Sequence, residues 1–75
     1  LNNMQQLNLI GLKCPIPVLK TKKFLATLDS EQQVTITTDD PASEKDLQEF
    51  CRKTGNHLIQ QFKQDNLIIT IIQRR

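Results

Sequence analysis

The stretch from Gly11 to Pro17 reads Gly-Leu-Lys-Cys-Pro-Ile-Pro and marks a change of pattern in the chain. Before it, residues 6–10 alternate polar and apolar side chains, which predicts a strand that ends at Gly11. After it, a helix is predicted from Pro15 to Leu28, because one face of that segment repeats at helical spacing. The residues of this face are Val18, Thr21, Leu25 and Leu28.

The rest of the chain continues the alternation of strands and helices. β-branched residues predict a strand at 33–38, and two further strands are predicted at 57–63 and 66–72. The last two strands are joined at Asp65-Asn66, which favours a tight hairpin turn. Between them and the strand at 33–38, a second helix is predicted to end at about Thr54, before a left-handed Gly55.

The start of the second helix has two interpretations. Asp40 is typical of a capping residue, and Pro41 suits the first helical position, where a missing N–H costs nothing. Ser43 and Asp46 resemble a capping box one turn later, with Asp in place of the usual Glu. The apolar stripe of this helix consists of Leu47, Phe50, Cys51 and Thr54.

The element order β-α-β-α-β-β predicts an α/β (α+β) two-layer sandwich in one domain, residues 1–75. Its four-stranded mixed sheet carries both helices on one face. The first two strands are expected to be parallel, and the last two to form an antiparallel hairpin. In the last strand we expect Leu67, Ile69 and Ile71 to face one way. Ile68 and Ile72 then lie on the opposite, exposed face.

Composition excludes several classes of protein. The 75 residues include ten basic and eight acidic side chains, a net charge of +2, which excludes a strongly basic nucleic-acid arm. With three Phe, no Tyr and no Trp, no stacking platform for single-stranded nucleic acid is expected. No apolar run exceeds three residues, so no membrane span is predicted. Two cysteines are too few for a disulfide scaffold, so we expect a reduced, cytoplasmic protein.

Cys14 is the candidate reactive residue, because it lies where the first strand gives way to the first helix. Pro15 and Pro17 lack backbone N–H groups, which leaves the amides of Cys14 and Ile16 near the sulfur. Those amides, the positive helix end and the neighbouring Lys13 are expected to favour thiolate over thiol. Pro17 occupies the place of a second cysteine in a Cys-x-x-Cys pair, so an adduct cannot collapse into a local disulfide. The pattern favours a sulfur carrier over a hydrolase, and it predicts no metal site.

Other polar residues have simpler explanations beside their functional ones. Cys51 is expected to pack in the core, although a disulfide with Cys14 is an alternative. His57 is a candidate triad partner for Cys14, and a surface position is the simpler interpretation. Four lysines are candidates for docking an acidic partner: Lys13, Lys20, Lys22 and Lys23. The alternative is that they only form a solvated helix face. Asp39 and Asp40 are candidates for partner docking or acid–base work, and helix capping alone accounts for Asp40.

The chain resembles the TusA/SirA family of small sulfur-carrier proteins, from about Leu7 to the last strand. The stretch from Gly11 to Pro17 is similar to the family signature Gly-Leu-x-Cys-Pro-x-Pro, which Gly11, Leu12, Cys14, Pro15 and Pro17 match. Two further landmarks follow in order: Asp39-Asp40-Pro41-Ala42, and Asp46 with Phe50-Cys51 and Gly55.

This resemblance implies a two-layer α/β sandwich and a persulfide carried on Cys14, without a cofactor. The implied donors are a cysteine desulfurase or a rhodanese-like protein. The implied acceptor is a later relay protein, serving tRNA 2-thiolation, sulfur oxidation or cofactor synthesis. The transfer is of the sulfurtransferase type. Lys13, Lys20 and Lys23 are expected to orient these protein partners.

Two other functions remain open from the sequence. In one, Cys14 is structural and the face of Ile68 and Ile72 binds a partner, as in a regulatory or interaction module. In the other, the protein senses thiol oxidation by pairing Cys14 with Cys51 or with a partner.

Overall fold

The computed structural model describes residues 4–75 and confirms the predicted order of elements. The strands are β1 (Gln5–Asn8), β2 (Gln33–Thr38), β3 (His57–Gln64) and β4 (Leu67–Gln73). The helices are α1 (Ile16–Leu25), between β1 and β2, and α2 (Ala42–Thr54), between β2 and β3.

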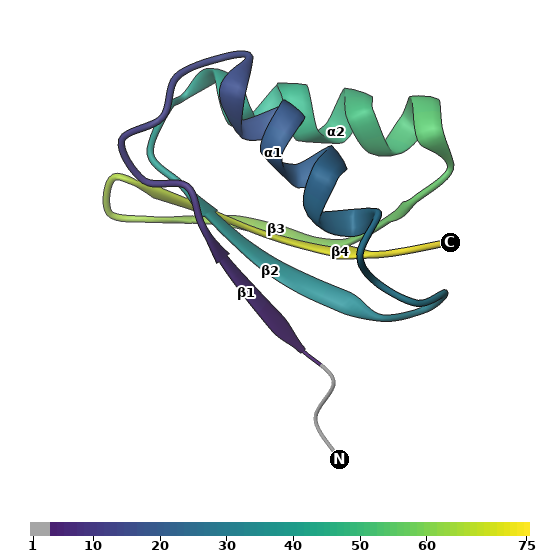
Figure 1. Ribbon diagram of the computed structural model, residues 1–75. Helices are drawn as coiled ribbons and strands as arrows, with labels where there is room; N and C mark the ends of the chain where they lie inside the picture. The colour runs from purple at the N-terminus through teal and green to yellow at the C-terminus, as the bar shows by residue number, and fades with distance from the viewer. Residues whose placement is uncertain (1–3) are drawn as a thin grey trace.

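The sheet has the mixed topology expected of this order. Its strand order is β1-β2-β4-β3, with β1 parallel to β2 and the other neighbours antiparallel. Both helices lie on the same face of the sheet, and the other face is open (Figure 1). The two-layer α+β sandwich is therefore confirmed. A consequence for function is that both helices begin at the same edge of the molecule, beyond the ends of the parallel strands β1 and β2 (Figure 1).

The strand before Gly11 and the helix after it both end earlier than predicted. β1 stops at Asn8, although Leu9 still donates to the carbonyl of Thr37 at 2.8 Å and is buried. α1 ends at Leu25, three residues before the predicted end at Leu28. Leu28 is nevertheless buried, because the turn after the helix keeps it against the core.

α2 packs its predicted stripe into the core and ends as expected. Leu47, Phe50 and Cys51 are buried, and Gly55 stops the helix at a φ of 81°. Gly55 accommodates this left-handed conformation because it has no Cβ. At the other end, α2 begins at Ala42, whose amide donates to the Asp40 carboxylate at 3.2 Å. Asp40 therefore satisfies an amide of the first turn from the position just before the N-cap residue, Pro41.

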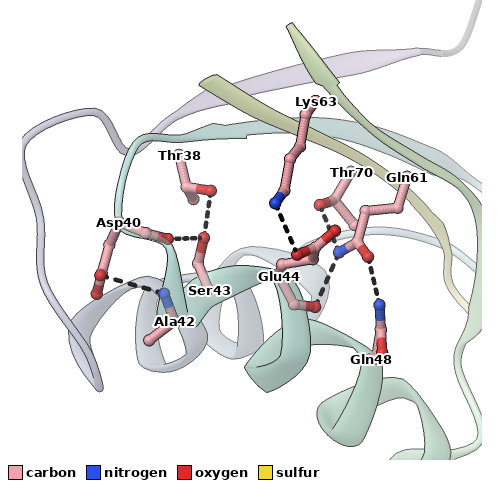
Figure 2. A network of polar contacts seen from close by, with 9 residues as sticks. All are labelled: Thr38, Asp40, Ala42, Ser43, Glu44, Gln48, Gln61, Lys63 and Thr70. Carbon is pink, nitrogen blue, oxygen red and sulfur yellow. Dashed lines mark hydrogen bonds and ion pairs between the residues drawn. The ribbon is translucent and has the colours of Figure 1, made fainter. Parts of the chain in front are cut away.

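The alternative capping box at Ser43 and Asp46 is wrong. The Ser43 hydroxyl is buried and donates to the carbonyl of Asp40 at 2.7 Å. It also lies 2.5 Å from the hydroxyl of Thr38, so it connects α2 to the end of β2 (Figure 2). Asp46 points elsewhere, toward the segment before α1.

The predicted orientation of β4 is also wrong. Ile68 and Ile72 face the helices and are 4% and 0% exposed, whereas Leu67, Ile69 and Ile71 are half-buried on the open face. The register explains the difference, because Ile72 pairs with the buried Val34 of β2. Residues directly opposite each other in a sheet share a face.

Candidate functional site

The segment between β1 and α1 presents Cys14 at the surface. Gly11 adopts a φ of 88°, and a Cβ placed there would meet no atom within 4 Å, so conformation rather than space favours glycine. The Cys14–Pro15 peptide bond is cis, and α1 begins two residues after Cys14, with Pro17 in its first turn. Cys14 is exposed, as the sequence predicted for a reactive thiol.

Two aspartates from the β2–α2 connection hold this segment. Asp39 accepts a hydrogen bond from the amide of Gly11 at 2.8 Å. Asp40 accepts one from the amide of Cys14, also at 2.8 Å. The bonds from the Cys14 and Ala42 amides lower the pKa of Asp40 below its ordinary value, and the charge of Lys13 adds to this effect. The structure therefore brings both predicted residues, Asp39 and Asp40, to the segment of Cys14, where each accepts a hydrogen bond from a backbone amide.

The sulfur of Cys14 is directed toward α2. Its Sγ donates a hydrogen bond to Oδ2 of Asp46 at 2.9 Å. This bond, together with the negative charges of Asp46 and Asp40, raises the pKa of the Cys14 thiol above its ordinary value. The thiol form is therefore favoured in the free protein.

The expectation that backbone amides stabilise a Cys14 thiolate is wrong. The Cys14 amide is taken by Asp40, and the Ile16 amide donates to the carbonyl of Lys13 at 2.8 Å. Spacing along the chain could not show this, because Asp40 and Asp46 reach Cys14 from 26 and 32 residues away. In the sequence, Asp46 belongs to the second-helix landmark of the family and, with Ser43, resembles part of a capping box; neither pattern indicates a contact with Cys14.

The other cysteine and the histidine lie apart from this site. Cys51 is 5% exposed, and burial raises its pKa to about 11, so its predicted core position is confirmed. Both cysteines are free thiols. His57 is exposed at the start of β3, which follows the C-terminal end of α2. Cys14 lies at the opposite end of α2, because it bonds to Asp40 and Asp46 at and before the N-terminal half of that helix. A triad of Cys14 and His57 is therefore not formed.

A basic surface continues from Cys14 along α1. Lys13, Lys20, Lys22 and Lys23 are all exposed. Within residues 4–75, the ion pairs join Arg52 to Glu49 and Lys63 to Glu44, so these four lysines have no carboxylate partner. On α1, Ile16, Leu19, Lys20 and Lys23 follow helical spacing and share one exposed face.

The part of the chain that the structure describes has neither a cluster of metal-binding side chains nor a membrane-spanning helix. Residues 4–75 contain no group of three His, Cys, Asp or Glu side chains arranged to hold a metal ion. Neither described helix is long and apolar enough to cross a membrane.

Comparisons with known proteins agree with the fold and with the family that the sequence resembles. The family described as Sulfurtransferase TusA matches residues 5–74 of this chain. The sulfur carrier protein TusA of Allochromatium vinosum is 41% identical over 56 residues, 75% of this chain and 74% of that protein. A relative in Neisseria meningitidis is 34% identical over 73 residues, 97% of this chain and 99% of its own length.

A solved structure supports the same assignment. The SirA-like protein of Desulfitobacterium hafniense superimposes with a TM-score of 0.80 at 29% identity, covering 93% of this chain and 95% of that one. Fold and sequence thus define a small sulfur carrier of the sulfurtransferase class. The chain belongs to the TusA family.

Proposed function

We propose that Cys14 carries sulfane sulfur as a persulfide between a donor protein and an acceptor protein. The observation that carries this proposal is the exposed Cys14 thiol, fixed through its own amide by Asp40 at 2.8 Å. A carrier has to present its sulfur to two different partners in turn, which requires an accessible atom on a defined backbone.

The proposed transfer needs no oxidant or reductant. On loading, Cys14 Sγ attacks the outer sulfur of a donor persulfide, the new Sγ–S bond forms, and the donor's own S–S bond breaks to leave a donor thiolate. On delivery, the sulfur of an acceptor thiol attacks that outer sulfur, a new S–S bond forms on the acceptor, and the Sγ–S bond breaks, which returns Cys14 to its thiol form. Free thiols persist in reducing compartments, so we place this chemistry in the cytoplasm.

The proposed donor is a cysteine desulfurase or a rhodanese-like protein, and the proposed acceptor is a downstream relay protein. The lysines before and along α1 have no carboxylate partner among residues 4–75, which supports docking of acidic partner surfaces, with Lys13, Lys20 and Lys23 as contacts. The exposed Ile16 and Leu19 offer apolar contact area on the same face. tRNA thiolation is one destination for such a relay, and sulfur oxidation and cofactor synthesis are the others.

The two rival functions lack structural support. The interaction module needs Ile68 and Ile72 at the surface, and both are buried. The redox sensor in its internal form needs Cys51 to reach Cys14, but Cys51 lies in the core.

The proposal is tested by incubating the protein with a cysteine desulfurase and cysteine and then measuring intact mass. Wild type and Cys51→Ala are expected to gain one sulfur atom, and Cys14→Ser to gain none. No added sulfur in wild type, or equal loading of Cys14→Ser, would end the carrier assignment.

A further inference from the structure

Among residues 4–75, Asp46 is the one carboxylate that accepts a hydrogen bond from the reacting atom of the proposed carrier. It belongs to helix α2, and its Oδ2 accepts the S–H of Cys14 at 2.9 Å. Asp40, the neighbouring carboxylate, is already occupied by the amides of Cys14 and Ala42. Asp46 is therefore the acceptor available to the thiol proton.

This contact poses a chemical problem for sulfur transfer. The nucleophile in persulfide exchange is the thiolate, and a carboxylate beside the sulfur favours the protonated thiol. A thiol with a raised pKa is also a poor leaving group when the sulfur is delivered. Both difficulties disappear if the proton moves between sulfur and carboxylate during the reaction.

We propose, resting on the carrier function above, that Asp46 is a catalytic residue that relays the Cys14 proton in both transfer steps. On loading, Oδ2 takes the proton as Sγ attacks the outer donor sulfur, the donor S–S bond breaks, and the proton passes on to the departing donor thiolate. On delivery, the proton of the acceptor thiol passes through Asp46 to Sγ as the Sγ–S bond breaks. Each step balances as one thiol and one persulfide exchanging a sulfur atom.

A simpler alternative is that Asp46 only repels the thiolate. The two roles predict opposite effects of Asp46→Asn, which keeps the side-chain shape but cannot accept the proton. If Asp46 only repels, removing its charge increases both the thiolate population and the transfer rate. If Asp46 relays the proton, the thiolate population rises while transfer slows.

The test measures these two quantities separately in a Cys51→Ala background. Thiolate formation is followed by ultraviolet absorbance during a pH titration, in a chain without Tyr or Trp. Transfer is followed in single turnovers: loading from a persulfidated desulfurase, and delivery from the loaded protein to dithiothreitol. Asp29→Asn is the matched control, because it makes the same change of charge at an exposed position in the α1–β2 connection.

For Asp46→Asn we expect the thiolate titration to move to lower pH, while loading and delivery near neutral pH slow by about 100-fold or more. Asp46→Glu keeps a carboxylate and should recover part of the rate, which also guards against a folding defect in the Asn variant. Transfer by Asp46→Asn at or above the wild-type rate would overturn the relay. If the wild-type protein accepts no sulfur, the carrier function itself is overturned. The titration would then report only how Asp46 affects the Cys14 thiol.

Discussion

Asp40 joins two elements through one carboxylate, accepting the amide of Cys14 on one oxygen and that of Ala42 on the other. The segment that presents the sulfur is thus fastened to the first turn of α2. Asp39 adds a third bond, to Gly11, so the position of Cys14 depends on the connection between β2 and α2.

The first prediction concerns the pH dependence of this bonding. The folded-state pKa of Asp40 lies below its ordinary value of 3.8, so the stability it contributes is complete above that value. As pH falls through the folded-state pKa, the carboxylate is protonated and the contribution is lost. Wild type should therefore be more stable than Asp40→Ala at neutral pH, and the difference should close in acid.

This prediction is checked by urea denaturation of both proteins across the acid range, with Asp29→Ala as the control. A gap between wild type and Asp40→Ala that stays constant down to strongly acid pH would show that the Asp40 charge is not what holds the segment.

The second prediction concerns the buried hydroxyl pair of Thr38 and Ser43. Ser43→Ala should lower the free energy of unfolding by about 1–3 kcal/mol, because it leaves the Thr38 hydroxyl with only a long 3.5 Å contact to the Ile68 carbonyl. Adding Thr38→Val removes the orphaned hydroxyl, so the double variant should lose less than the sum of the single losses. Equilibrium unfolding of all four proteins measures the coupling, and strict additivity would argue against this pairing.

The third prediction concerns the orientation of β4. Ile72→Ala should cost about 2–5 kcal/mol of unfolding free energy, because Ile72 is fully buried between the sheet and the helices. Ile71→Ala is the matched control on the open face and should cost distinctly less. A larger loss for Ile71→Ala in chemical denaturation would reverse the assignment of the two faces.

The sequence predicted the elements and their order because each carries a local signal. The alternation in 33–38, the helical stripe up to Leu28 and Gly55 after α2 depend on neighbours only a few residues apart. The orientation of β4 had no such signal, because Leu-Ile-Ile-Thr-Ile-Ile is apolar on both faces. Thr70, the single polar residue of this stretch, is buried on the face of Ile68 and Ile72 and accepts a hydrogen bond from Gln61 (Figure 2).

The candidate site likewise has a part that the sequence could predict and a part that it could not. Cys14 and the prolines around it could be selected from a short motif, and Cys51 could be assigned to the core from its place on the helical stripe. The electrostatic surroundings of the sulfur could not be predicted. They depend on Asp40 and Asp46, which come from a connection and a helix far along the chain. Asp40 accepts the Cys14 amide that local reasoning had given to the sulfur, and Asp46 accepts the S–H of Cys14.

The fourth prediction is the delivery of sulfur from Cys14 itself. Protein loaded by a desulfurase and then separated from it should release about one sulfide per chain to dithiothreitol, and peptide mass spectrometry before release should place the extra sulfur on Cys14. Sulfur found on Cys51, or sulfide released equally by Cys14→Ser, would contradict the account.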